Sequence, residues 1–385
     1  MRRIRSTGAL LIAVSMLGAC AEQVIEPAEQ FVAEPEYARK QAPAADPIPL
    51  QLQFGESDLI AELERDLASR LINPGDYVCT STPLIDRLNQ QVAQLIAEEP
   101  EIIVPLAARG ALSIPGDYAL IFETEATPQH FGYDGEYTHV LQKTDRDAKE
   151  FFDIDASAIH LVAMHGTMLL DEAKVAQTLL LYGLPADTAT KWAGEIADLL
   201  AASTLLNGGN HPLFTFNAFA FRGSAGLGVP PKIVMGDGIL AAYEEMGFAD
   251  VAPQAVFTHE FAHHIQFQKG YFSDPIRLSM ETAAERTRYT ELMADAYSAY
   301  FMTHSRGLAL NRHRVAQFLS VFFNIGDCSF FASGHHGTPL QRMRAAQFGF
   351  DVADQAREQG HILTSDQFHD LFLAEWAELI APDAI

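Results

Sequence analysis

The sequence predicts a mainly helical α+β fold. Long stretches with apolar residues at helical spacing dominate the chain, whereas only a few short segments favour strands. These strand-like segments cluster just before the helix that carries the clearest motif, which places a small sheet beside that helix. With 385 residues, of which 48% are hydrophobic and 20% charged, the chain has the composition of a globular protein with a sizeable core.

The N-terminus has the features of an export signal. Three arginines within the first five residues precede a short apolar run, residues 9–17. This run is too short to span a bilayer as a helix, because a span needs about 20 apolar residues. It leads into Leu-Gly-Ala-Cys ending at Cys20, which resembles the lipobox of bacterial lipoproteins. We expect residues 1–19 to be a lipoprotein signal peptide and Cys20 to be lipidated. An ordinary secretory signal with an incidental cysteine is the alternative.

The segment after the signal, residues 20–50, is rich in Ala, Glu, Pro and Gln and has little apolar periodicity, as expected of a flexible tether. The protein has three cysteines. If Cys20 is acylated, Cys79 and Cys328 remain as an even pair in an oxidising compartment, which predicts a disulfide between them. Two separate buried thiols are the alternative.

The formal net charge of −24 argues against two classes of partner. Nucleic acids and anionic membrane surfaces would both repel a chain of this charge. The charge favours solubility and identifies no substrate.

Residues 51–206 form a predicted helical N-terminal region. Leucines four residues apart predict one helix over residues 59–71, and apolar residues at similar spacing predict another over residues 84–95. A short segment, residues 118–123, follows a Pro-Gly break and favours a strand. Nothing in this region indicates its role.

A turn-rich segment, residues 207–212, marks the clearest internal boundary and opens a second domain, residues 207–385. Two short β-prone segments follow, residues 213–221 and 232–235. A proline near residue 252 then leads into the helix that carries the motif.

The motif is H-E-x-x-H, formed by His259, Glu260 and His263. Residues four apart project from the same face of a helix, so the two imidazoles can share one zinc ion. Glu260 is then placed to polarise a water at the metal. A five-residue match also arises by chance, so the surrounding residues must support it.

A catalytic zinc ion needs a third protein ligand and one open position. The metzincin extension is excluded, because Gln266 and Lys269 stand where it has glycine and histidine. A carboxylate from the next helix is the alternative, and Glu291 and Asp295 share one face of a helical stretch over residues 281–302. We expect Glu291 to bind the metal and Asp295 to accept the second N–H of a ligating histidine. Other carboxylates remain as substitutes for Glu291: Asp274, Glu281 and Glu285.

These residues carry a family resemblance. H-E-x-x-H followed by E-x-x-A-D is the pattern of gluzincin metallopeptidases, and residues 259–266 resemble the H-E-x-x-H-H-x-Q of bacterial neutral zinc metallopeptidases. Residues 217–220 are similar to the N-A-x-A edge strand of related zinc endopeptidases. Residues 336–342 are similar to their H-G-T-x-x-Q-R segment. The resemblance covers about residues 213–350 and implies a zincin-like domain with a small sheet over two zinc-bearing helices.

The resemblance also implies roles for individual residues. It makes His259, His263 and Glu291 the ligands of one zinc ion per chain, and Glu260 the general base and acid that activates a zinc-bound water. It places Asp295 behind a ligating histidine. The edge strand would bind an extended substrate by strand addition. That strand comprises Asn217, Ala218, Phe219 and Ala220.

The role of the downstream segment stays open between two readings. His336, or less plausibly Arg342, stabilises the oxyanion of the tetrahedral intermediate. Alternatively, His336 packs or caps a loop before the Gly-Thr-Pro turn. His264 points about 100° away from His263 around the helix, which favours a packing or surface role over metal binding.

The expected function is a zinc-dependent endopeptidase that hydrolyses peptide bonds of exported or envelope proteins. The lipid on Cys20 would hold it in the bacterial cell envelope, at the outer membrane facing the periplasm, with a protein or peptide as its substrate. Two alternatives remain: a catalytically silent metal-binding lipoprotein with a scaffold or assembly role, and a zinc amidase acting on cell-wall amides.

Overall fold

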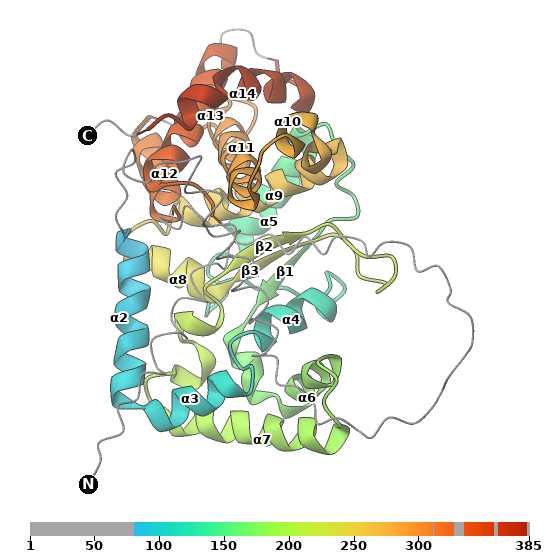
Figure 1. Cartoon of the computed structure of the whole chain (residues 1–385), viewed down its shortest axis with the longest axis vertical. Coiled ribbons are helices and arrows are strands. Elements are labelled where there is room, and N and C mark those ends of the chain that lie inside the picture. The colour runs from blue at the N-terminus through green and yellow to red at the C-terminus, as the bar shows by residue number, and fades with distance from the viewer. Residues whose placement is uncertain (1–80, 311, 327–334, 358–360, 383–385) are drawn as a thin grey trace.

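The computed structural model describes residues 81–310, 312–326, 335–357 and 361–382 (Figure 1). Within these residues the chain is mainly helical and contains one three-stranded sheet, which confirms the predicted α+β class. Several expectations lie outside the described residues: the signal peptide, the lipid on Cys20, the tether, the helix over residues 59–71 and the Cys79–Cys328 disulfide.

The elements follow one another in a simple order. The first part of the described chain forms α2 (Pro83–Glu98), α3 (Pro100–Ala108), α4 (Ile114–Ile121), α5 (Thr138–Phe151), β1 (His160–Met164), α6 (Glu172–Leu181) and α7 (Ala186–Ala202). The second part forms β2 (Ala218–Phe221), β3 (Lys232–Gly236), α8 (Asp237–Glu245), α9 (Ala252–Lys269), α10 (Pro275–Leu278), α11 (Ala283–Thr303), α12 (Arg312–Asn324), α13 (Pro339–Arg357) and α14 (Ser365–Leu379). Short 3-10 helices lie between them: η3 (Gly166–Leu170), η4 (Asn207–Gly209), η5 (Pro212–Phe214) and η6 (Tyr271–Ser273).

Helix α2 is the helix that the apolar spacing over residues 84–95 predicts. Pro83 occupies its first turn, where a missing N–H costs nothing, and the Thr82 side chain accepts a hydrogen bond from the backbone N–H of Ile85. The apolar residues at helical spacing are all buried: Leu84, Leu88, Val92 and Leu95.

The strand expected over residues 118–123 is wrong, because α4 covers most of that segment. Its apolar residues pack against the sheet from one face of a helix instead of joining the sheet. The buried ammonium of Lys232 caps the end of α4 and donates hydrogen bonds to the carbonyls of Ala119, Leu120 and Glu123 at 3.2, 2.6 and 2.5 Å. These contacts come from a strand more than a hundred residues away, so local sequence could not reveal them.

The sheet has the order β1-β3-β2. Strand β1 runs parallel to β3, with His160 opposite Lys232, and β2 runs antiparallel to β3, with Ala218 opposite Met235. The predicted strand over residues 232–235 is confirmed, and β2 occupies the end of the predicted segment 213–221. Strand β1 was not expected, and it brings a segment from before residue 207 into the same sheet.

Alternating side chains give the sheet two covered faces, as the two-residue period of a strand requires. Ile233 and Met235 of β3 pack in the large cluster that contains α9, whereas Val234 packs with Ala119 of α4. Figure 1 shows α9 on one side of the sheet and α4, α6 and α7 on the other. Helix α9 therefore rests on the sheet with its other side available to α11.

Helix α11 is buried on all sides from Arg288 to Met302, as expected for the central helix of a core. It packs between α9 and α13. Gly349 lets α13 approach closely, since a Cβ there would lie 2.1 Å from the Ala296 carbonyl oxygen and 3.0 Å from the Cβ of Ala299.

We predict that Gly349→Val separates α13 from α11 and lowers the free energy of unfolding by about 2 kcal/mol or more, the usual cost of overpacking a core. Chemical denaturation measures this change. Gly226→Ala is the control, because the added methyl group meets only the Ser224 hydroxyl at 4.0 Å. Equal stability of the two variants would contradict the close packing of α11 and α13.

Candidate metal centre

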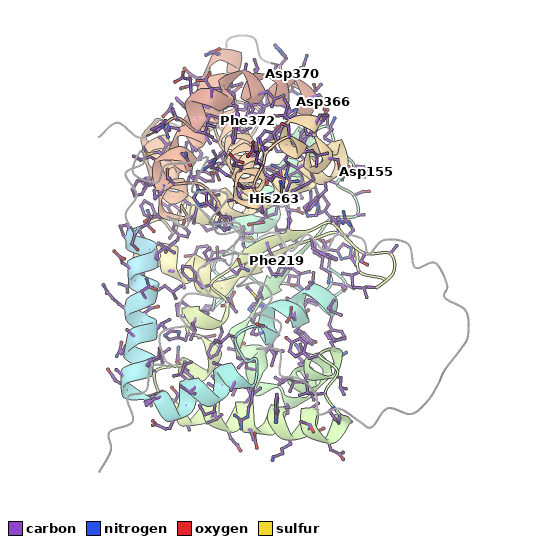
Figure 2. The ribbon with its side chains drawn as sticks, in the orientation of Figure 1. Asp155, Phe219, His263, Asp366, Asp370 and Phe372 are labelled. Atoms are coloured by element: carbon purple, nitrogen blue, oxygen red, sulfur yellow. The ribbon has the colours of Figure 1, made fainter. Side chains whose placement is uncertain are left out.

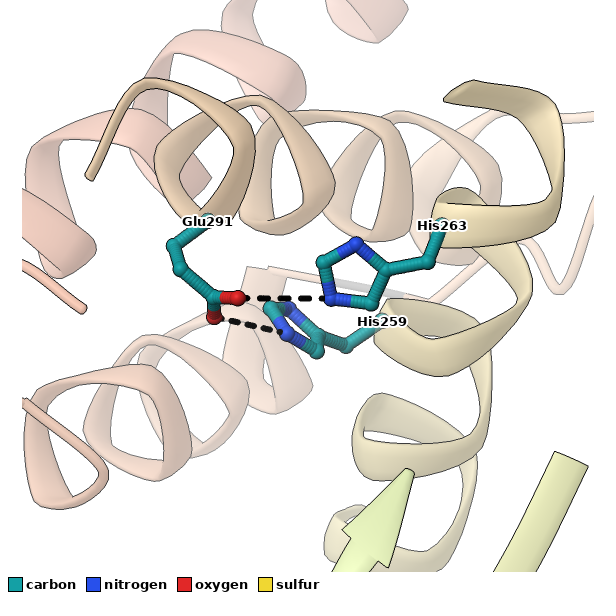
Figure 3. A group of neighbouring side chains, drawn as sticks. All are labelled: His259, His263 and Glu291. Atoms are coloured by element: carbon teal, nitrogen blue, oxygen red, sulfur yellow. Dashed lines mark ion pairs between the residues drawn. The ribbon is translucent and has the colours of Figure 1, made fainter. Parts of the chain in front are cut away.

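Helix α9 presents the two histidines of the motif on one face. The helix ends at Gly270, whose left-handed φ of 76° suits the residue that follows a helix. The His259 and His263 rings lie with their centroids 4.8 Å apart and their planes at 89°. Both Nε2 atoms point at the carboxylate of Glu291 on α11 (Figure 3). The helical spacing therefore places two imidazole lone pairs at one point.

Glu291 completes a group that can bind a metal ion. Its Oε2 lies 3.2 Å from the Nε2 of His259, and its Oε1 lies 3.5 Å from the Nε2 of His263. One ligand atom from each residue lies within 4.8 Å of the others. A tetrahedral zinc ion with bonds of about 2.05 Å spaces its ligands about 3.3 Å apart, so these distances fit such an ion.

The surroundings of Glu291 favour a metal ion over a purely structural role. The side chain is 0% exposed, yet neither carboxylate oxygen has a hydrogen bond from the described residues. A buried carboxylate without hydrogen bonds is costly unless a cation compensates it. The Arg342 guanidinium lies 3.6 Å from Oε2, an ion pair without a hydrogen bond, and a metal ion would compensate the carboxylate at closer range. Burial opposes its ionisation, but His336 and the two ligand histidines together hold the pKa of Glu291 well below its ordinary value.

The second ring nitrogen of each ligand histidine is held by an acceptor. The Nδ1 of His259 lies 2.9 Å from Oδ1 of Asp295, and the Nδ1 of His263 lies 2.9 Å from Oε1 of Gln266. Each Nδ1 therefore carries a proton, which turns each Nε2 toward the metal position. Burial alone would lower the pKa of His259, but Asp295 and Glu291 together raise it to about 10. A metal ion at this centre must therefore displace the Nε2 proton of His259. Asp295 thus lies behind the ligand His259, as the sequence predicted.

Gln266 is a site residue that the sequence analysis missed. Its amide nitrogen donates to the Thr290 carbonyl at 2.7 Å, which turns its amide oxygen toward His263. The sequence spacing could have indicated this contact, because Gln266 lies three residues after His263 and so on the same helical face. From the sequence, Gln266 served to exclude the metzincin pattern and to extend the family resemblance, but it was given no role at the site.

Arg342 on α13 holds Asp295 in place instead of facing a substrate. Its Nε and Nη2 donate to the two oxygens of Asp295, both at 2.7 Å. Both side chains are fully buried, and a bidentate pair of this kind fixes the orientation of the carboxylate. The alternative oxyanion role for Arg342 therefore does not fit the structure.

The segment that begins at His336 forms the entry to α13. Gly337 has a φ of 103°, which favours glycine, and Thr338 and Gln341 bond each other's backbone N–H at 3.1 Å and so cap the helix. His336 is buried, and its charge acts on the pKa values of both Glu260 and Glu291. The structure thus brings His336 to the metal centre, and its chemical role stays a prediction.

Glu260 lies on α9 outside the ligand group and is buried. Burial raises its pKa to about 8, with the Glu291 carboxylate adding to the effect, while His259, Arg342 and His336 oppose it. Burial lowers the pKa of His263 to about 4, so its imidazole is neutral, as a metal ligand must be.

The remaining acidic candidates have other roles. Glu285 forms a capping box with Thr282 at the start of α11, and the Asp274 side chain caps α10. Glu281 is exposed. None of them belongs to the metal-binding group, so the substitute ligands are excluded.

His264 has the packing role that was expected, but it is buried and not on the surface. Its Nε2 donates to the carbonyl of Lys232 at 2.9 Å and so ties α9 to β3. The motif helix is therefore fixed to the sheet from one face and to α11 from another.

The segment Asn217–Ala220 lies at the edge of the sheet. Strand β2 begins at Ala218 and pairs only with β3 among the described residues. Ala218 packs with α9, whereas Phe219 packs with the α4 side, as its place below the sheet in Figure 2 also shows. Small side chains thus let α9 approach the edge strand closely.

Comparisons with known proteins found no match among protein-family models, curated proteins or solved structures, so the functional argument rests on the geometry of the metal centre. Across the described ranges, no helix is both long and apolar enough to cross a membrane. The fold and the site define a mainly helical α+β protein with a buried two-histidine, one-glutamate group that can hold a metal ion.

We predict that Gln266→Leu lowers metal affinity by about 10- to 100-fold, because His263 loses the acceptor that orients it. Competition with a zinc chelator of known affinity measures the change. Gln268→Leu is the matched control, since Gln268 lies on the same helix but contacts Asp155. Unchanged affinity in the Gln266 variant, with an intact fold, would show that Gln266 does not support the site.

Proposed function

We propose that the protein is a zinc-dependent endopeptidase. The observation that carries the proposal is the buried group of His259, His263 and Glu291 with Glu260 beside it. A metal held by three residues keeps a position open for water or substrate, which is the arrangement of a catalytic ion. The resemblance to gluzincins and bacterial neutral zinc metallopeptidases supports the same function.

Zinc is the metal that we propose for the site. Two imidazoles and one carboxylate are a common ligand set for catalytic zinc, and no soft sulfur ligand belongs to the group. Bound there, a zinc ion supplies Lewis acidity, which polarises a carbonyl group and lowers the pKa of a coordinated water to about 7.

Side chains of the protein then carry out the proton transfers and stabilise the oxyanion. Glu260 accepts the proton of the attacking water and returns it to the leaving amine. Its raised pKa suits a carboxyl group that must both take and release a proton near neutral pH. His336 donates a hydrogen bond to the oxyanion that develops on the substrate carbonyl.

The edge strand supplies a site for the peptide. An extended substrate can pair with the free edge of β2 and so lie alongside α9, which carries the catalytic residues. Asn217, just before the strand, has a buried Oδ1 without a hydrogen bond from the described residues. This acceptor fits a backbone N–H of a bound peptide.

The proposal includes a location. We propose that the lipid on Cys20 holds the enzyme at the outer membrane, facing the periplasm, where exported or envelope proteins are its substrates. The Cys79–Cys328 disulfide belongs to the same proposal, because both thiols would be exposed to an oxidising compartment.

Two other functions use the same metal site. A silent scaffold lipoprotein would have no need for Glu260, whose buried carboxyl group is costly to retain without a role. A zinc amidase acting on cell-wall amides would use the same residues but would not need an open strand edge. The edge position of β2 in the described sheet therefore favours a peptide substrate.

The experiment is cleavage of an unfolded protein by the zinc-loaded chain. We predict that Glu260→Gln keeps one zinc per chain and loses activity by about 100-fold or more, because general acid–base catalysis disappears. Glu375→Gln, an exposed glutamate on α14, is the matched control and should act like the parent. Cleavage by the Glu260 variant at the parental rate would refute the proposed mechanism, and activity on cell-wall amides alone would favour the amidase.

A further inference from the structure

A second site lies apart from the metal centre. A cavity of about 280 Å³ opens between α4, η3, α6 and the end of β1. Figure 1 shows α4 and α6 across the sheet from α9. The lining of this cavity contains none of the metal-site residues. The polar residues in the lining are Tyr118, Glu123, His130, His165, Thr167, Asp171 and Lys174.

The carboxyl ends of the two parallel strands supply a His–Asp pair to this cavity. His165 follows β1 and Asp237 follows β3, so the adjacent parallel strands bring them together. The Nδ1 of His165 lies 2.6 Å from Oδ2 of Asp237, and the other Asp237 oxygen accepts from the Gly132 N–H at 3.0 Å. Ligand sites in sheets with parallel strands lie at this carboxyl edge.

This pair fixes what His165 offers to a ligand. Asp237 is 2% exposed, and its carboxylate accepts a hydrogen bond from the Nδ1–H of His165. In the tautomer with the proton on Nδ1, Nε2 is an acceptor, and no described residue donates to it. The cavity therefore suits a ligand that carries an N–H or O–H donor.

His130 adds a second imidazole but not a second metal ligand. Its ring stacks on His165 with centroids 4.1 Å apart and planes at 17°. In stacked rings the nitrogen lone pairs lie in nearly parallel planes, so they do not converge on one ion. The pair forms a flat wall with acceptor atoms at its rim, which suits an organic ligand.

The charges around the cavity favour a cation. Asp237, Glu123 and Asp171 are acidic, and Lys174 is the basic residue of the lining. Asp171 is engaged at the start of α6, where its side chain accepts two backbone N–H groups. One oxygen of Glu123, Oε1, lies 3.6 Å from the Lys174 ammonium, which itself lies 5.0 Å from the centre of the Tyr118 ring. The other oxygen accepts long hydrogen bonds from Thr127 and Gln129, at 3.3 and 3.5 Å. A ligand ammonium can therefore replace Lys174 beside Glu123.

We propose that this cavity binds a small protonated amine. The ammonium donates to Nε2 of His165 and to the Glu123 carboxylate, and a short alkyl part lies against Pro115, Ala119 and Met168. The volume limits the ligand to one smaller than a typical drug-sized molecule. This site is independent of the metal centre and of the peptidase proposal.

The test uses the full chain with labelled histidine and three probes of equal size: propylamine, propionate and 1-propanol. Carbon–proton correlation spectra follow the Cε1–Hε1 signals of His165 and His130, which His165→Gln and His130→Gln assign. We expect saturable shifts of both signals with propylamine, and no saturation with the other two probes.

Two substitutions, one removing a negative charge and one removing a positive charge, test the charge preference of the cavity. Glu123→Gln should weaken propylamine binding by about threefold or more, and Lys174→Gln should leave it unchanged or strengthen it. Both side chains are partly exposed, so both variants are expected to fold. Saturation by propionate in place of propylamine, the reverse response of the two variants, or no saturable shift with any probe would overturn the proposal.

Discussion

The structure of the metal centre depends on one buried carboxylate. Asp295 receives two hydrogen bonds from Arg342 and lies 2.9 Å from Nδ1 of His259. It thereby links α9, α11 and α13, the three helices that surround the site. Burying these charges is costly, and only complete pairing compensates for it, so loss of any one partner leaves an unpaired charge in the core.

The local part of the site was predictable from sequence. The spacing of His259 and His263 places them on one helical face, and the spacing of Glu291 and Asp295 separates the metal ligand from the residue behind the histidine. These assignments rest on the geometry of single helices, which the chain sets within one turn. That α9 and α11 bring the two faces together is a tertiary contact, which the need for a third zinc ligand and the family resemblance both suggested.

The other parts depend on contacts between distant segments. Residues 118–121 belong to a helix and not to a strand, and the Lys232 ammonium stabilises the end of that helix, α4. Strand β1 forms because β3 lies beside it. His165 and Asp237 are 72 residues apart, so no spacing rule could have paired them. Strand β3 connects the metal centre with the second cavity. Its Lys232 carbonyl holds α9 through His264, and Asp237, which directly follows the strand, holds His165 at the cavity.

The central claim is that His259, His263 and Glu291 hold one zinc ion. X-ray absorption at the zinc edge of the purified chain tests it most directly. The expected spectrum shows one zinc per chain, nitrogen and oxygen neighbours at about 2.0 Å, outer scattering from two imidazoles and no sulfur. Glu291→Ala should lose the metal, whereas Glu285→Ala, which removes a helix cap, should retain it. A sulfur ligand, or zinc retained equally by both variants, would contradict the account.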